Sequence, residues 1–210
     1  MTHLSRLHRV LMIALLSAGH AAMMPAQDVK AALTAQTAEA DTLLQQRKFA
    51  EAEKAYRVLL PQAQKDLPPE SPLNMRIRNN LAVALSSQGK ISEAEAAHRA
   101  TLVLLEKAAK PDKTAIQVCK NNLGECLFAQ RKYAEAEKVH REVYVDRQTT
   151  LGKENRETLV SGYNLANCLY QLRRRDDARA ITRVITPIAK RTLGPTHNYT
   201  VLFEKLDAKL

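Results

Sequence analysis

The stretch that decides the fold spans residues 121–137 and reads Asn-Asn-Leu-Gly-Glu-Cys-Leu-Phe-Ala-Gln-Arg-Lys-Tyr-Ala-Glu-Ala-Glu. Its first half places Leu123 and Leu127 four residues apart, the spacing that brings two side chains onto one face of an α-helix. The pair Arg131-Lys132 interrupts this pattern, and a second helical pattern begins at Tyr133. The stretch therefore predicts two helices joined by a short turn.

The same pattern recurs along the chain with a period of 42 residues. One alanine of the second helix stands at positions 52, 94, 136 and 178, so every interval is 42. Single helix pairs cannot bury their apolar faces alone, whereas stacked pairs share a continuous core. Ser92, three residues before Glu95, predicts an N-cap with a capping box. The period predicts repeats at about 29–68, 71–110, 113–152 and 155–194, with a capping helix at 199–210.

Other residues in this register indicate packing rather than chemistry. Cys126 and Cys168 are 42 residues apart, which predicts a small buried position. His98 and His140 show the same interval, which predicts a packing position on the second helix. The sequence contains no glycine-rich phosphate loop, zinc-protease motif or nucleophile motif. We therefore expect no catalytic residue, no metal site and no cofactor.

Composition favours an all-α fold and narrows the choice of partners. Of the 210 residues, 45% are hydrophobic and 4% aromatic, with six glycines and no tryptophan. A β-sandwich or barrel would want more aromatic and β-branched residues and more turn glycines, so an all-β fold is disfavoured. Lys and Arg number 32 against 22 Asp and Glu, a formal net charge of +10 that favours an acidic partner. Nucleic acid, an anionic membrane surface and an acidic peptide all fit that charge.

The first 27 residues form a separate segment without Asp or Glu. Basic residues precede an apolar run from Val10 to Ala18, and small residues follow, which is the layout of a secretory signal peptide. The run is shorter than the roughly 20 residues that a transmembrane helix needs. An organellar transit peptide and a helix packed on the first repeat are the alternatives. A cleaved signal predicts secretion, the periplasm or an organelle lumen; otherwise we expect a cytoplasmic protein.

The residues of each repeat resemble a known family. The pattern Leu-(Ala/Gly)-x-x-Leu, with an alanine thirteen residues after the first leucine, is similar to the tetratricopeptide repeat. The period of 42, the paired asparagines, the Glu-Ala-Glu of the second helix and the link Leu193–His197 resemble its kinesin light chain subclass. The resemblance covers about residues 30–210. It implies a right-handed superhelical solenoid of antiparallel helix pairs, with the first helices lining a concave surface. HEAT and armadillo repeats have a compatible period but do not predict this spacing.

Asparagines in mid-helix mark the candidate site. Asn80, Asn122 and Asn164 lie 42 residues apart, although asparagine is an indifferent helix former. A side-chain amide offers a donor and an acceptor, so it can pair with the backbone of an extended peptide. In the resembling family, asparagines at this place hold the main chain of the bound peptide. The alternative is that they bond across neighbouring helices and fix the stacking, and one residue can do both. Further candidates on the same face are Asn79, Asn121, Asn167, Arg76 and Tyr163.

These observations predict a non-catalytic interaction scaffold that binds a peptide or protein segment in a concave groove. A sensor, in which a short peptide changes the curvature of the solenoid, is the runner-up. A nucleic-acid binder ranks third, because the acidic residues of each Glu-Ala-Glu interrupt the basic charge that such a surface needs. An enzyme acting on a small-molecule substrate ranks last.

Overall fold

The computed structural model describes residues 26–210. The predicted targeting segment, residues 1–27, falls outside this range except for its last two residues, which lie in the first helix. The described residues contain nine α-helices and no β-strand. In chain order they are α2 (Ala26–Gln45), α3 (Phe49–Asp66), α4 (Pro72–Ser87), α5 (Ile91–Lys107), α6 (Lys113–Ala129), α7 (Tyr133–Thr150), α8 (Arg156–Gln171), α9 (Arg175–Thr192) and α10 (Asn198–Asp207).

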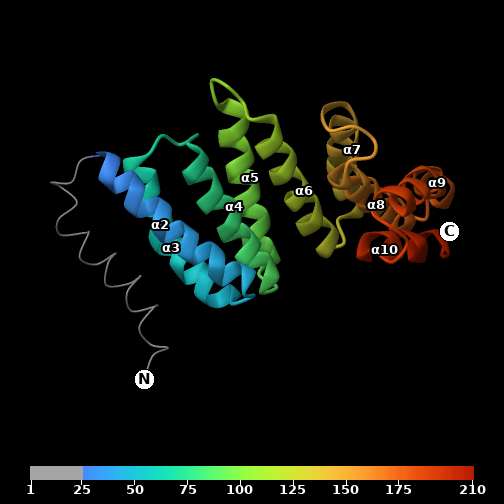
Figure 1. Ribbon diagram of the computed structural model, residues 1–210, viewed down its shortest axis with the longest axis horizontal. Coiled ribbons are helices and arrows are strands. Elements are labelled where there is room, and N and C mark those ends of the chain that lie inside the picture. Colours follow the sequence, from blue (N-terminus) through green and yellow to red (C-terminus); the bar gives the residue numbers. More distant parts are fainter. Residues whose placement is uncertain (1–25) are drawn as a thin grey trace. The chain divides into compact units, whose positions relative to one another are not determined.

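The helices belong to two compact units (Figure 1). The N-terminal unit ends at Ala109 and contains α2 to α5; the C-terminal unit, Lys110–Leu210, contains α6 to α10. Within each unit every helix packs against the helix that follows it in the sequence. The first helices of neighbouring repeats also touch, as α2 touches α4 and α6 touches α8. The all-α prediction of antiparallel helix pairs is confirmed.

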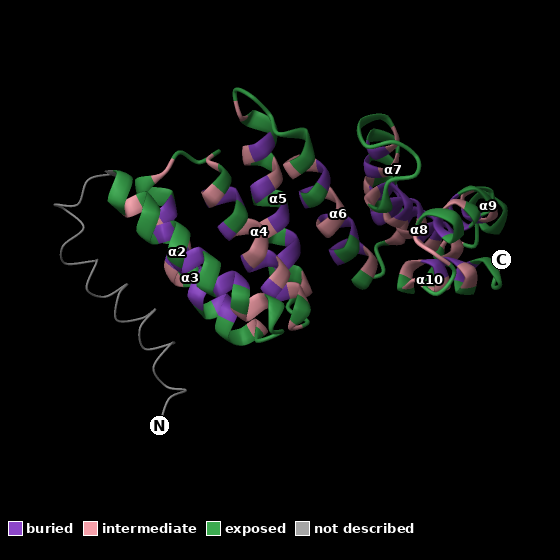
Figure 2. Ribbon diagram, in the orientation of Figure 1, coloured by how far each residue is buried: buried purple, intermediate pink, exposed green. Residues whose placement is uncertain are grey.

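The core follows the 42-residue register. The repeated alanine of the second helix is fully buried in all four repeats. The residue is small because a larger side chain there would push the paired helices apart. Cys126 and Cys168 are buried at one equivalent position, and His98 and His140 are buried at another, as predicted. Figure 2 shows the buried residues running as stripes along the helices, with exposed residues between them.

The turn inside each repeat places one residue in the left-handed region of the backbone. Gly89 has φ 79°, and its equivalents Arg47, Arg131 and Arg173 have φ of 59°, 62° and 61°. The turn is therefore kept where glycine is replaced, although a side chain makes this conformation less favourable. Three arginines occupy it in the 42-residue register.

A carboxylate on the second helix anchors the turn of the following repeat. Glu53, whose side chain is 9% exposed, accepts hydrogen bonds from Lys90 Nζ at 2.7 Å and Gln88 Nε2 at 2.8 Å. The hydrogen bond from Lys90 lowers the pKa of Glu53 to about 2, against burial, which raises it. In the C-terminal unit Glu137 lies 3.8 Å from Arg174 in the same register. The turns are thus tied to the preceding helix by charge-assisted contacts.

The first and second helices of a repeat begin differently. Four first helices start from a residue whose side chain accepts a backbone hydrogen bond: Ser71, Asp112, Asn155 and His197. The second helices follow Lys48, Lys90, Lys132 and Arg174, none of which caps the helix with its side chain. The prediction that Ser92 caps α5 is wrong, because that helix already begins at Ile91 and leaves Ser92 inside its first turn.

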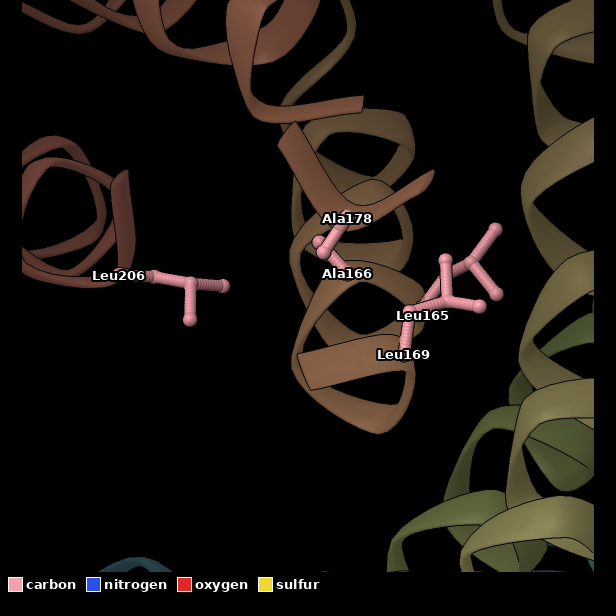
Figure 3. Close-up of a cluster of buried hydrophobic side chains, with 5 residues drawn as sticks. All are labelled: Leu165, Ala166, Leu169, Ala178 and Leu206. Carbon is pink, nitrogen blue, oxygen red and sulfur yellow. The ribbon is translucent and has the colours of Figure 1, made fainter. Parts of the chain in front are cut away.

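The last helix covers the end of the C-terminal unit. Leu206 reaches from α10 toward α8 and joins a buried cluster with Leu165, Ala166, Leu169 and Ala178 (Figure 3). The predicted capping helix therefore buries apolar surface that the fourth repeat would otherwise expose.

Candidate functional site

The predicted site residues lie on the solvent-facing side of the first helices. On α4, Leu81 and Ala82 are buried, whereas Asn79 and Asn80 are half-buried. The same division recurs on α6 and α8, where the candidate asparagines are half-buried beside a buried leucine. We call these half-buried residues the amide stripe: Asn79, Asn80, Asn121, Asn122, Asn164 and Asn167.

In the N-terminal unit a carboxylate on α2 gathers the stripe residues of α4. Asp41 is 8% exposed and accepts hydrogen bonds from Asn80 Nδ2 at 2.7 Å and Tyr56 Oη at 2.5 Å. The guanidinium of Arg76 forms an ion pair with the same carboxylate. Burial and the neighbouring Asp41 raise the pKa of Tyr56. Asn79 Nδ2 donates to Asn80 Oδ1 at 3.2 Å. Arg76 and Asn80 thus join one network across three helices.

The C-terminal unit contains a related contact between its first helices. Asn121 Nδ2 on α6 donates to Glu125 Oε1 at 2.8 Å, and Asn164 Nδ2 on α8 donates to Asn121 Oδ1 at 3.3 Å. Glu125 also accepts from Asn164. The pairs Asp41–Asn80 and Glu125–Asn164 have the same separation of 39 residues. The stripe therefore links successive first helices within each unit through side-chain amides and carboxylates.

The remaining candidates occupy the same face of the first helices. Tyr163 stacks on Phe203 with ring centroids 5.2 Å apart, so one of its faces belongs to the core. Asn122 and Asn167 are half-buried on α6 and α8. Among the described residues Asn167 makes no side-chain hydrogen bond. The Asn167 amide is therefore able to form hydrogen bonds with a ligand.

The hydrogen bonds bear on the two roles left open for the asparagines. Asn80 and Asn164 bond across neighbouring helices, which is the stacking role. Peptide binding by the stripe stays a prediction. The sequence interpretation missed Asp41, whose position is equivalent to Glu125 and Asn167 but lies on a helix without the Asn-Leu landmark.

The described residues also show how metal-ligating side chains and cysteines are placed. No group of three or more His, Cys, Asp or Glu residues between 26 and 210 is arranged to hold a metal ion. The three cysteines are buried, and burial raises the pKa of the Cys168 thiol to about 12, which disfavours the nucleophilic thiolate. None of the helices between residues 26 and 210 has the length and hydropathy of a membrane span.

Family models agree with the geometry. Two models, each described as tetratricopeptide repeat, match residues 37–112 and 116–191, and together they cover more than half of the chain. The chain belongs to the tetratricopeptide-repeat family. Its repeats are of the kinesin light chain-like type, and the fold is the all-α solenoid fold of that family. No curated protein matches the sequence.

Solved structures share the fold at low sequence identity. A putative kinesin light chain from Podosopora anserina with nearly identical TPR-like repeats aligns with TM-score 0.66 and 19% identity, over 91% of this chain and 99% of that one. A variant of that protein gives TM-score 0.70 and 18% identity, over 89% and 86%. BtubC (BKLC) from P. vanneervenii gives TM-score 0.68 and 21% identity, over 97% and 88%. These likenesses show the fold.

Tetratricopeptide repeats are typically non-catalytic scaffolds for protein–protein interaction. Membership of the family therefore indicates protein partners for this chain.

Proposed function

We propose that the chain is a non-catalytic interaction module that binds an extended peptide or protein segment along the amide stripe on the first helices of a unit. The observation that supports this most directly is the recurrence of half-buried asparagines on α4, α6 and α8, beside residues that are fully buried. If these asparagines only stabilised the core, we would expect their side chains to be buried inside it. They lie instead at the border between the core and the solvent.

The chemistry of the stripe suits a main chain. Backbone N–H and C=O groups need partners of both kinds, and an amide side chain supplies both. Asn167 offers a complete amide, while Asn80 and Asn164 have donors engaged with Asp41 and Asn121. Amides that bond across helices are held in place, so a peptide meets groups that have already lost their side-chain freedom. In the resembling family the equivalent surface is concave.

Charge acts at longer range than these contacts. The formal net charge of +10 raises the encounter rate with acidic partners at low salt. The one basic residue among the candidates, Arg76, is already paired with Asp41. We therefore assign binding of the ligand main chain to the neutral amides of the stripe, and assign the net positive charge a role in steering.

A photo-crosslinking experiment tests this function. Benzoylphenylalanine is placed at Asn167, on the stripe, or at Val145, which is 53% exposed on the second helix α7. We expect protein adducts from position 167 and none from position 145 when each variant is irradiated in extract of the source organism. Circular dichroism melting of both variants checks that the fold is retained. Adducts from position 145 alone, or equal yields from both, would contradict binding along the stripe.

A further inference from the structure

A ladder of aliphatic residues runs beside the amide stripe in the C-terminal unit. Val118, Val160 and Leu202 occupy equivalent positions, 42 residues apart, on α6, α8 and α10. Val118 is 37% and Leu202 40% exposed, and Val160 is half-buried. The equivalent residue on α4 is Arg76, which is tied to Asp41. The two units therefore offer different surfaces at the same positions of the repeat.

Opposite charges flank this ladder. Glu125 is exposed on α6, and Lys205 is exposed on α10, at the position equivalent to Tyr163. Glu125 is the only charged residue among positions 118, 121, 122 and 125 of α6 and 160, 163, 164 and 167 of α8. Runs of basic residues in this unit lie at two of its turns, at 131–132 and 173–175. The ladder is thus bordered by a carboxylate at one end and an ammonium group at the other.

The carboxylate of Glu125 is held in position yet lacks a direct ion pair among the described residues. Asn121 and Asn164 donate hydrogen bonds to it, and both are neutral. Although Glu125 is exposed, partial desolvation beside the packed helices raises its pKa, while the hydrogen bonds from Asn121 and Asn164 oppose the rise. Arg147, whose positive charge acts on Glu125, is buried and donates to Ser161 Oγ at 2.8 Å. A positively charged side chain of a ligand would form the ion pair that Glu125 lacks.

The spacing of the helices sets the length of a matching ligand. Helices that pack together lie about 10 Å apart, so α6 and α10 are separated by about 20 Å across α8. An extended chain advances about 3.4 Å per residue, so about six residues span that distance. Alternate side chains of such a segment point to the same side and would face the ladder.

We propose that this face of the C-terminal unit binds an extended segment with a basic residue opposite Glu125, aliphatic residues against Val118, Val160 and Leu202, and an acidic residue opposite Lys205. The inference rests on the proposed function and names its ligand class. The opposite charges at the two ends give the segment one preferred direction along the repeats.

Selection from a displayed library of random twelve-residue peptides tests the proposal on the full chain. We expect enrichment of peptides in which Lys or Arg is separated from Asp or Glu by about five residues that include aliphatic ones. Glu125→Lys should reverse the preference at the basic position and weaken a peptide selected on the unmodified chain by roughly tenfold. Lys205→Glu should do the same at the acidic position.

Two further variants keep the result interpretable. Glu142→Lys makes the same charge change on α7, where Glu142 pairs with Lys120, and should leave the selected peptides unchanged. Glu125→Gln keeps an acceptor for Asn121 and should abolish the basic preference without reversing it. Melting curves of all variants confirm that each is folded.

The outcomes separate this inference from the function on which it rests. Enriched peptides without the paired charges, or with charges that ignore the changes at 125 and 205, overturn the ligand class and leave peptide binding in place. Absence of any enriched peptide, together with absence of adducts from position 167, overturns both.

Discussion

Three arginines hold a backbone conformation that glycine adopts more readily. Arg47, Arg131 and Arg173 have φ near 60°, where a side chain is unfavourable by about 1–2 kcal/mol, and Gly89 shows that the turn accepts glycine. The hydrogen bonds of the turn are the same in each case, as Arg131 N donates to Phe128 O at 2.9 Å and Gly89 N donates to Ser86 O at 2.9 Å. The conformation belongs to the turn rather than to the residue that occupies it.

Exchanging these residues should change stability in opposite directions. We expect Arg131→Gly to raise the free energy of unfolding by about 0.5–1 kcal/mol, because relief of the left-handed strain exceeds the added chain entropy of glycine. The reverse change, Gly89→Arg, should lower it by a similar amount. Urea titrations of both variants measure the difference. A loss of stability in Arg131→Gly would mean that the arginine side chain makes contacts worth more than the strain.

Close approach of helices is the feature that matters at the scale of the element. Gly162 on α8 lies so near its neighbours that an added Cβ would stand 2.9 Å from Tyr144 Cε2 and 3.0 Å from Ile185 Cγ2. Tyr144 belongs to α7 and Ile185 to α9. The glycine thus lets α8 pack closely against both second helices of its unit.

Gly162→Ala should destabilise the chain even though alanine is the better helix former. Alanine gains about 1 kcal/mol of helix propensity, whereas overpacking of a core typically costs about 1–3 kcal/mol, so we expect a net loss of about 1 kcal/mol. Thermal melting measures it. In a background of Ile185→Ala the same substitution should cost less, because the methyl group it meets is gone. An equal cost in both backgrounds would place the strain elsewhere.

At the scale of the whole molecule, pH couples to one buried histidine in each unit. Burial lowers the pKa of His98 and of His140 to about 4, and both are 1% exposed. The unfolded chain binds a proton at each histidine below about pH 6.5, whereas the folded chain stays neutral there until about pH 4. Stability is therefore lost as the pH falls from about 6.5 toward 4.

This linkage gives a measurable acid sensitivity. Each histidine should remove about 2 kcal/mol from the free energy of unfolding of its unit between about pH 7 and pH 5. Replacing His98 and His140 with leucine, which cannot titrate, should flatten that dependence. Urea unfolding of both proteins at the two pH values makes the comparison. An unchanged dependence in the double variant would show that other groups carry it.

Much of the fold could be predicted from the sequence, because each repeat places small and apolar residues at the same positions of its helices. The alanines at 42-residue intervals identify the helix contacts before any coordinates are known, and all four are buried. The turns at Arg131 and Arg173 were also predictable, since the flanking apolar pattern continues through them.

Other features depend on contacts that the pattern does not contain. On α2 the positions equivalent to Asn80 and Leu81 hold Ala38 and Glu39, so nothing in the sequence pointed to Asp41 as the acceptor for Asn80. Ser92 is not the N-cap of α5, because the helix already begins one residue earlier, at Ile91. Side-chain partners across helices and helix ends are set by geometry that short sequence motifs only partly encode.

The anchoring carboxylates of α3 and α7 contact the turn of the next repeat, as Glu53 meets Lys90 and Glu137 meets Arg174. Each span is 37 residues, shorter than the period of 42. A gene segment of one period, duplicated in tandem, would encode both halves of the next such joint without any change of side chain. Duplication of one such period would therefore add a repeat whose turn is anchored in the same way.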